Sequence, residues 1–538
     1  MFRLSTFKIV VLIFFGYFII TNSKTASAQK KFTLSGFIKE EATGEYSIGA
    51  SVYLKKSGAE EKKLGTTTNQ YGFYSITLEQ GTYNLTVSYV GFEDYNKEIK
   101  LEKDIRLNMQ MKEKGYLANE VEILGVRPDE NIKSTEMGVM TLDMEQVKQL
   151  PAFMGETDIL KTIQLLPGVQ SAGEGNAGFY VRGGGPDQNL VLLDEAVVYN
   201  TGHLFGFFSV FNGDAIKNVE LIKGNMPAQY GGRLSSVLDI SMKDGNSQKF
   251  HGEGGIGIIS SRITLEGPIK KDTSSFIVSA RRTYADVLAQ PFIKSGSKGS
   301  AYYFYDLNTK LNYRISDKHR IFLSGYFGRD VFRYSNNKTF GSAFKVDIPW
   351  GNATTSLRWN YLINKKLFVN TTAIFSDYQF EFGATQSEFE FRLFSGIRDW
   401  SGKLDFSYYP NTKNKIKFGS NYIWHTFTPS HASAKSGDVQ FDLGGIVKLY
   451  AHEAALYFSD EYEISNRLKV NAGIRYSYFQ QVGPFKRYVK STVGNLVTDS
   501  ILFNKGDKVA EYHGPEPRLS ARFELNKNSS IKAGFAQN

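Results

Sequence analysis

Glycine-rich stretches are the places where this sequence comes nearest to a site for chemistry. Arg182 to Gly185 reads RGGG and lies between two β-type runs, one ending at Val181 and the other beginning at Asn189. Glycines after a strand can cradle a phosphate, but such a loop needs a following Lys-Ser/Thr and the start of a helix. Here Pro186 and Asp187 lead into a strand instead. The stretch therefore favours a tightly folded structural corner over a phosphate site.

A second glycine stretch and the histidines give no better support for catalysis. GEGGIG, Gly252 to Gly257, matches a dinucleotide pattern, but the residues after it alternate like a strand where that site requires a helix. His425 and His431 are six residues apart, which is not the spacing of a compact metal motif, and the chain has no Cys. We therefore expect no catalytic residue, no metal and no cofactor, and a protein that is not an enzyme.

The composition is typical of a β protein with exposed aromatic surface. The 538 residues include 51 Gly, 41 Phe and 31 Tyr, and aromatic residues make up 14% of the chain. The formal charge of +10 comes from Lys and Arg that are scattered rather than clustered. This distribution favours a solvated basic surface over nucleic-acid binding.

The N-terminus has the pattern of a secretory signal. Arg3 and Lys8 precede the apolar run Ile9 to Ile20, and an Ala-Ser-Ala end follows. We expect a signal peptide over residues 1–28, cleaved between Ala28 and Gln29. The run is short for a bilayer span, which disfavours the alternative of a retained anchor. No later segment has 18 unbroken apolar residues, so any membrane crossing must use strands.

Residues 30–112 alternate short β-type runs with turns at the spacing of a small β-sandwich. Asn69 to Gly72 is predicted as one of these turns, and Gly81 as a strand junction. Through GTTTNQYGFYSITL and GTYNLTVSYVGF the region resembles the carboxypeptidase regulatory-like domain, a module without peptidase chemistry. The His and Glu spacing of a zinc peptidase is absent from the sequence. We interpret this region as a periplasmic accessory module.

Residues 128–245 have mixed helix and strand signals. Asp143 is a candidate N-cap for a short helix that ends at Pro151. Ile159, Ile163 and Leu166 share one face of a second helix, and Asn212 is the candidate cap of a third. The region predicts a small α/β domain.

Residues 246–538 repeat a hairpin rhythm. Short polar turns are 46 to 61 residues apart and lie near Lys271, Asp317, Asn364, Thr412, Asn466 and Lys527. Each interval holds a strand, a longer loop and a returning strand, which is the pattern of an antiparallel transmembrane β-barrel. From Leu468 to Tyr478 apolar residues alternate with polar ones such as Arg475, which predicts one lipid face and one lumen face. Asp460 breaks the pattern of the preceding strand, so it marks either a bulge or the membrane edge. A soluble β-sandwich explains the alternation too, but not the loop asymmetry.

The stretches FYVRGGGPDQNLVLLDEAVVYN and NVELIKGNMPAQYGGRLSSVLDISMKDG make the chain resemble the plug domain of TonB-dependent outer-membrane receptors. The order of sandwich, plug and barrel resembles a subgroup of that family. Glu195 is a departure, because many members have Gly after the Asp of LLDG. The plug motif residues are then Arg182, Gly183, Gly184, Gly185, Asp194, Tyr230, Gly231, Gly232 and Arg233. We expect Arg182 and Arg233 to form ion pairs with carboxylates of the barrel lumen.

The resemblance implies an outer-membrane importer of a diderm bacterium, contacting membrane lipid and energised through TonB. TonB would add a strand to an extended segment within the linker 113–127. The candidate contact residues are Glu120, Val121, Glu122, Ile123 and Leu124; the alternative is that they form the first strand of the plug. The sequence does not favour an obligate surface lipoprotein partner.

The ligand is left open among ferric siderophores, cobalamin, glycans and peptides. Its contacts are expected around Tyr199 to Phe208 and in Gln480 to Pro515. A passive pore or an adhesin is the alternative function, although neither needs a plug. The hairpins amount to about 12 strands, where a plugged barrel needs about 22. The sequence therefore predicts a chain truncated within its barrel.

Overall fold

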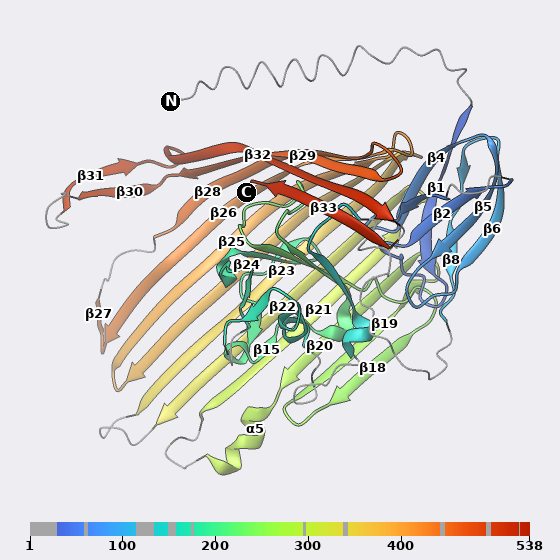
Figure 1. Ribbon diagram of the computed structural model, residues 1–538. Helices are drawn as coiled ribbons and strands as arrows, with labels where there is room; N and C mark the ends of the chain where they lie inside the picture. The colour runs from blue at the N-terminus through green and yellow to red at the C-terminus, as the bar shows by residue number, and fades with distance from the viewer. Residues whose placement is uncertain are drawn as a thin grey trace.

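The computed structural model describes three parts that follow one another along the chain: a sandwich, a plug and a wall of long strands (Figure 1). The predicted signal peptide, its cleavage site at Ala28 and Gln29, Pro151 and the TonB-contact candidates Glu120 to Leu124 lie outside the described residues. The structure describes residues 30–58, 63–114, 134–148, 156, 158–173, 177–293, 297, 299–336, 343–441, 447–490, 497–526 and 528–537.

The sandwich has two sheets, ordered β4-β1-β7, with β8 also on β1, and β3-β2-β5-β6. Alternating residues of both sheets, among them Leu34, Val52 and Leu85, are buried between them. Asn69 forms the predicted turn, since its carbonyl accepts from Gly72 N at 3.0 Å and its side chain accepts from Tyr71 N and Phe73 N. The strands are β1 Lys31–Glu40, β2 Ser51–Lys56, β3 Lys63–Thr67, β4 Phe73–Glu79, β5 Gly81–Ser88, β6 Tyr95–Leu101, β7 Ile105–Arg106 and β8 Met109–Met111.

The plug is built on a mixed sheet ordered β13-β12-β17-β16-β9, in which β12 and β17 are parallel. Its apolar core includes Ile159 and Ile163 of α4, and Leu166 packs against that core. The predicted apolar face of this helix is thus confirmed. The elements are β9 Val139–Asp143, α3 Met144–Lys148, α4 Ile159–Gln164, β10 Val169–Ser171, β11 Phe179–Val181, η1 Pro186–Gln188, β12 Asn189–Leu193, β13 Ala196–Val197, β14 Gly202–His203, η2 Leu204–Gly206, β15 Phe208–Ser209, η3 Gly213–Ala215, β16 Ile216–Lys223 and β17 Ser236–Met242.

Two details of the plug differ from the prediction. Asp143 is the last residue of strand β9, and helix α3 starts directly after it at Met144. Asn212 does cap the next predicted helix, with its side chain accepting from Asp214 N at 3.1 Å, but that element is a single 3₁₀ turn. A three-residue turn is enough to redirect the chain into β16, so no longer helix forms there.

The wall is one antiparallel sheet of 14 strands, and all six predicted turns connect neighbouring strands in it. The prediction of about 12 strands missed β18, which precedes the first turn, and the three-residue β27. The strands are β18 His251–Ile256, β19 Ser260–Lys270, β20 Ser274–Thr283, β21 Ala301–Arg314, β22 His319–Asn336, β23 Phe344–Asn364, β24 Leu367–Gln386, β25 Phe389–Tyr408, β26 Asn414–Ser436, β27 Val439–Phe441, β28 Leu449–Glu463, β29 Leu468–Val482, β32 Lys508–Asn526 and β33 Ser529–Ala536.

Outside this sheet, α5 Ala285–Ala289 and η4 Gln290–Phe292 follow β20, and β30 Phe485–Lys490 pairs with β31 Val497–Phe503 in a projecting hairpin (Figure 1). Asp460 pairs in unbroken register with both neighbouring strands, so the bulge explanation is wrong. It lies three residues from the end of β28, beside the turn to β29. This position corresponds to the predicted membrane edge.

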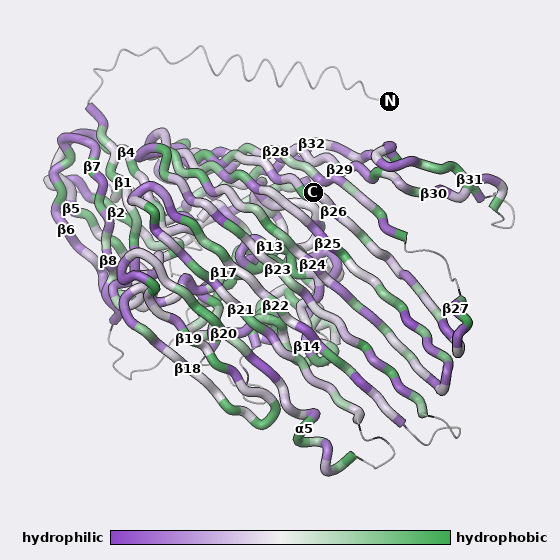
Figure 2. The backbone as a smooth tube through the Cα atoms, turned by 180° about the vertical axis from the view of Figure 1, so that it is seen from behind, coloured by the Kyte–Doolittle hydropathy of each residue, from purple (hydrophilic) through white to green (hydrophobic). Residues whose placement is uncertain are grey.

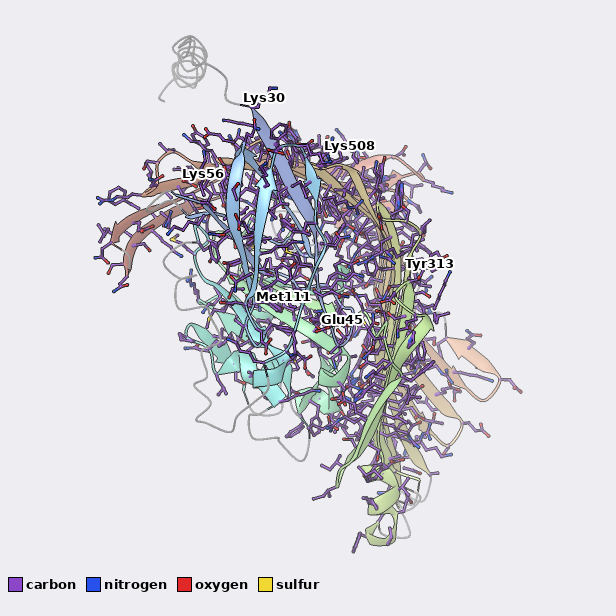
Figure 3. The ribbon with its side chains drawn as sticks, turned by 90° about the vertical axis from the view of Figure 1, so that its right-hand side faces the viewer. Lys30, Glu45, Lys56, Met111, Tyr313 and Lys508 are labelled. Carbon is purple, nitrogen blue, oxygen red and sulfur yellow. The ribbon has the colours of Figure 1, made fainter. Side chains whose placement is uncertain are left out.

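Alternation along the strands separates the two faces of the wall. In β21, Phe304, Asp306 and Lys310 are buried, whereas Leu307 and Leu311 are exposed. Seen from behind, polar and apolar residues succeed one another along each strand (Figure 2). The plug and the sandwich both lie on the other, concave side, and the labelled Tyr313 points away from them (Figure 3). The wall therefore presents its polar face to the two smaller parts.

The sandwich is fixed to the turn end of the wall by an apolar cluster. Phe73 is fully buried and stacks on Phe368 with ring centroids 5.6 Å apart, while Tyr409 and Leu362 complete the cluster. Ser75 Oγ also donates to the carbonyl of Lys365 at 2.7 Å. Buried aromatic rings remove large apolar areas from water, so this cluster contributes strongly to holding the two parts together.

Replacing Phe73 with Ala should undock the sandwich. The change removes a buried ring from the cluster, which costs about 3–5 kcal/mol in comparable sites. We expect limited proteolysis to release the sandwich from F73A faster than from the wild type. Val90→Ala, at a sandwich position that is 43% exposed, is the matched control. Equal release rates for the wild type and both variants would contradict this docking contact.

Candidate functional site: the contact between plug and wall

The RGGG stretch forms a tight turn within the plug. Val181 and Gly184 pair across it, with Gly184 N donating to the Val181 carbonyl at 2.9 Å. Arg182 and Gly183, the two residues between, have φ of 50° and 86°. Both are in the left-handed region that a two-residue turn of this type requires. A side chain on Gly184 would lie 2.4 Å from Ser235 Oγ, so close packing accounts for the next glycine.

Asp194 and Glu195 form a second turn of the same kind between β12 and β13. Leu193 pairs with Ala196, and the two residues between them have φ of 46° and 73°. The positive φ explains why Gly is favourable after the Asp at this position. A non-glycine residue there carries a strain of about 1 kcal/mol or more, so its side chain must make compensating contacts.

Glu195 makes those contacts with both other parts of the molecule. From the wall, Arg358 Nε lies 3.1 Å away, Asn370 Nδ2 donates at 3.0 Å and Lys403 Nζ lies 3.8 Å away. From the sandwich, the Tyr71 hydroxyl donates at 2.9 Å. One plug carboxylate thus joins all three parts of the molecule.

The charges around Glu195 keep it ionised. Burial on its own would raise the pKa of this carboxyl, but the Arg358 guanidinium and the Lys403 ammonium hold it at about 2, below the ordinary 4.5. Conversely, burial and the nearby Glu195 charge raise the pKa of the Tyr71 hydroxyl. Tyr71 therefore stays a hydrogen-bond donor and Glu195 an acceptor.

Other plug side chains repeat this arrangement along the wall. Asp194 contacts Lys310 at 3.0 Å, Asp214 contacts Arg262 at 2.7 Å and Glu156 contacts Arg281 at 3.5 Å. In each pair the plug supplies the carboxylate and the wall supplies the cation. His203 is a different case, because its ring contacts two wall carboxylates, Asp330 at 2.6 Å and Asp306 at 3.4 Å.

The predicted ion pairs of Arg182 and Arg233 are wrong within the described part of the chain. Arg182 makes no ion pair within 4.0 Å with any described carboxylate and extends past Gly138 and Gly224 inside the plug. Arg233 shares a cavity with wall residue Glu453 but donates to the Gly232 carbonyl at 2.8 Å. A sequence motif does not reveal where the side chain of one of its residues points. Here the arginines that reach across the interface belong to the wall.

Wall arginines bind backbone carbonyls beside the QYGGR stretch. Arg475 Nη1 donates to Gln229 O at 3.2 Å, and Arg518 Nη1 donates to Tyr230 O at 2.7 Å and Met226 O at 2.9 Å. The Tyr230 hydroxyl in turn donates to Asp239 at 2.7 Å within the plug. The arginines and lysines of the wall do not belong to any local sequence motif. The sequence indicates them only by their position on the inward face of an alternating strand.

The glycines of QYGGR allow this close approach. A methyl group on Gly231 would lie 2.4 Å from Arg475 Nε, and one on Gly232, whose φ is 74°, would lie 2.9 Å from Glu453 Oε1. Arg475 itself is only 2% exposed, which leaves it little room to move. The two glycines are therefore contact residues between plug and wall.

A cavity of about 770 Å³ remains between plug and wall beyond these contacts. Its lining includes Tyr199 and the segment Tyr512 to Pro515, which belong to the two predicted ligand regions. His425 also lines it, with Nδ1 2.7 Å from Asp399 and Nε2 3.3 Å from Glu453. Polar groups and rings facing one cavity suit a ligand that carries both kinds of surface.

The described residues contain no cluster of three or more His, Cys, Asp or Glu arranged to hold a metal ion. Within that same part of the chain, no helix has the length and apolar character needed to cross a membrane.

Known domains match all three parts. The CarboxypepD_reg-like domain matches residues 34–123, the TonB-dependent Receptor Plug Domain matches 131–236, and the TonB dependent receptor-like beta-barrel matches 278–538. The chain belongs to the TonB-dependent receptors. It is accordingly a protein of the bacterial outer membrane, and its wall is the β-barrel portion of such a receptor.

Individual relatives of this TonB-dependent receptor are distant. The TonB-dependent transporter Oar of Myxococcus xanthus is 26% identical over 196 residues, which is 34% of this chain and 18% of Oar. The copper transporter OprC is 11% identical with a TM-score of 0.54, over 75% of this chain and 64% of OprC. The FrpB iron transporter from Neisseria meningitidis is 14% identical with a TM-score of 0.54, over 75% and 65%. The chain spans less than two thirds of each, and the structural likeness shows the fold alone.

Replacing Glu195 with Gln should destabilise the receptor in a pH-dependent way. Loss of the charge leaves Arg358 without its buried partner, which costs roughly 3–5 kcal/mol at neutral pH. Lys403 loses one of its two carboxylates and keeps Asp405 at 3.0 Å. Because the folded pKa is depressed, this stabilisation is present above pH 4.5 and is lost as the pH falls to about 2. We expect the difference in apparent melting temperature between wild type and E195Q to shrink over that range.

The control for this measurement is Glu98→Gln, which removes an exposed sandwich carboxylate. Its melting temperature should track the wild type at every pH. A constant difference between wild type and E195Q from pH 7 to 2 would show that the Glu195 charge does not hold the three parts together.

Replacing Gly231 with Ala should weaken the contact between the plug and the wall. The added methyl group collides with the buried Arg475 side chain, and overpacking of this kind typically costs about 1–3 kcal/mol. We expect a lower melting temperature and faster hydrogen exchange at the Gln229 and Tyr230 amides. Gly402→Ala on the wall, where nothing lies within 4 Å of the added atom, is the control and should behave as wild type.

Proposed function

We propose that this receptor actively imports a large or scarce nutrient across the outer membrane into the periplasm. The observation that carries the proposal is the seating of the plug, which lies against the polar face of the wall and is held there by buried ion pairs. A solute can pass such a plug only if those contacts are broken or rearranged. The similar proteins, which include a TonB-dependent transporter and transporters of copper and iron, support a role in uptake.

The same contacts argue that import requires energy. The plug makes a series of buried ion pairs with the wall, and displacing it as a unit breaks them together before water has reached the separated charges. The outer membrane has no energy source of its own, so work must come from the inner membrane through TonB. We assign its contact to Glu120 to Leu124, within the linker 113–127, by strand addition.

A passive pore or an adhesin accounts less well for these features. A pore conducts through an open lumen, and an adhesin needs a rigid outer surface, so neither uses a plug that is seated by polar contacts. Ferric siderophores, cobalamin, glycans and peptides are all compatible with the mixed polar and aromatic lining of the 770 Å³ cavity.

Single cysteines at positions 120 to 124 should cross-link to TonB that carries a cysteine in its periplasmic domain. The chain has no natural Cys, so each disulfide reports one position. Strand addition predicts cross-links that form at several adjacent positions and are lost in Glu122→Pro, because proline removes a backbone donor. A cysteine at Val90, on the exposed surface of the sandwich, is the control and should not react.

The alternative assignment gives a different result. If Glu120 to Leu124 form the first plug strand, no cross-link forms and E122P lowers the melting temperature of the receptor. For transport itself, cells that depend on each nutrient class in turn should lose growth on one of them when the receptor is deleted or the proton-motive force is collapsed. Growth that is independent of the receptor on all four classes would contradict import.

A further inference from the structure

A basic cavity lies at the junction of the sandwich and the wall, away from the contact between Glu195 and the wall. Its volume is about 580 Å³, and both parts line it. Three carboxylates and five cations face it: Glu41, Asp272 and Asp317, against Lys39, Arg106, Arg314, Lys318 and Arg320. The excess of two positive charges is concentrated in a partly enclosed space, where charges interact more strongly than in open water.

Three of these cations form no ion pair within 4.0 Å among the described residues. Lys39 belongs to sandwich strand β1, Arg314 ends wall strand β21 and Arg320 lies near the start of β22. Within the described residues, none of the three has a carboxylate oxygen within 4.0 Å or a side-chain hydrogen bond. Burial and the two arginine charges lower the pKa of the Lys39 ammonium to about 8. Asp272 and Asp317 attract Lys39 and offset part of this charge, so the cluster is a local excess of positive charge that is only partly compensated.

The geometry brings the three charges together. Arg314 and Arg320 are direct partners in the antiparallel register, so their Cβ atoms are about 4.5–5.5 Å apart, and like charges in such pairs are destabilising. Lys39 Nζ and Arg320 Cζ both lie over the ring of Tyr46, 4.9 Å and 3.5 Å from its centroid. This ring offsets part of the repulsion by cation–π attraction, but it is neutral and leaves the charge excess in place.

We propose that this cavity binds a phosphate-bearing organic molecule. Two neighbouring guanidinium groups and an ammonium group match the several oxygens and the double negative charge of a phosphate. A bare phosphate fills only a small part of 580 Å³, and the rings of Phe37, Tyr46 and Tyr95 line the rest of the cavity. The remainder of the ligand packs against those rings.

Binding there fastens the sandwich to the wall. Without an anion, Lys39 of the sandwich repels Arg314 and Arg320 of the wall across the junction. A phosphate between them turns this repulsion into two attractive contacts, one on each part. The ligand thus stabilises the docked position of the sandwich, in addition to the apolar cluster around Phe73. This inference does not depend on nutrient import, and its failure would leave that proposal intact.

The test uses the full-length native receptor in detergent, with inorganic phosphate as the minimal probe. We expect phosphate to raise the melting temperature and slow the proteolytic release of the sandwich, whereas chloride at equal ionic strength does neither. Arg320→Gln and the double variant R314Q/R320Q should bind phosphate at least about tenfold more weakly, because charge-assisted hydrogen bonds are lost. Arg329→Gln on the same strand, outside the cavity, is the matched control and should bind as wild type.

Two further arms identify the source of the phosphate. Short-chain phosphatidylglycerol micelles present a lipid phosphate, and glycerol 3-phosphate presents a soluble ester. Tighter binding of the micelles indicates a lipid headgroup, and tighter binding of the soluble ester indicates a periplasmic metabolite. Short-chain phosphatidylcholine, whose headgroup has no net charge, should bind more weakly than phosphatidylglycerol.

The proposal is overturned if the wild type and R314Q/R320Q respond equally to every phosphate probe. It is also overturned if no probe binds and the double variant docks more firmly than the wild type, since the arginines would then be simple repulsive neighbours. Lys39→Gln, which changes the sandwich and leaves the wall strands intact, repeats the test without altering the register of β21 and β22.

Discussion

A buried carboxylate at a strained turn position is the contact on which the arrangement of this receptor depends. Glu195 is held at positive φ, and its side chain is bound by Arg358 and Lys403 of the wall and by Tyr71 of the sandwich. Removing these charges from water costs much of what their attraction returns, so the contact adds specificity more than net stability. The Glu195 contact fixes the position of the plug. It binds the plug less tightly than an apolar interface of equal area would.

The rest of the interface between plug and wall is also held by polar contacts that add specificity more than net stability. Its contacts are ion pairs, such as Asp194 with Lys310, and arginine bonds to backbone carbonyls beside Gly231 and Gly232. Water can replace each of these partners when the surfaces separate, which lowers the cost of separation relative to exposing apolar surface. The proposed import requires the plug to move and return to one position, and such contacts serve that requirement better than a hydrophobic core.

The sequence predicted the features that depend on neighbouring residues. It did not predict the contacts between residues that are far apart in the chain. All six hairpin turns of the wall were predictable because short polar turns and alternating strands are local patterns. β18 is half glycine and β27 has three residues, so neither shows a clear alternation. The tight turn at Arg182 was predictable from its glycines. The partners of Glu195 were not, because Arg358 lies 163 residues away along the chain and has no motif of its own. Arg182 and Arg233 were assigned wrongly for the same reason.

The sandwich is attached to its two neighbours by different kinds of contact. It meets the plug through polar groups, Tyr71 with Glu195 and Glu40 and Glu45 with Lys217. Its contact with the wall includes polar groups too, such as Ser75 with Lys365, but adds the buried rings of Phe73, Phe368 and Tyr409. Apolar surface is costly to expose, whereas polar partners can be exchanged for water. In the proposed import, the weaker boundary of a displaced plug is therefore the one between sandwich and plug. The sandwich then remains with the wall, so the wall and sandwich partners of Glu195 are in place for the returning plug.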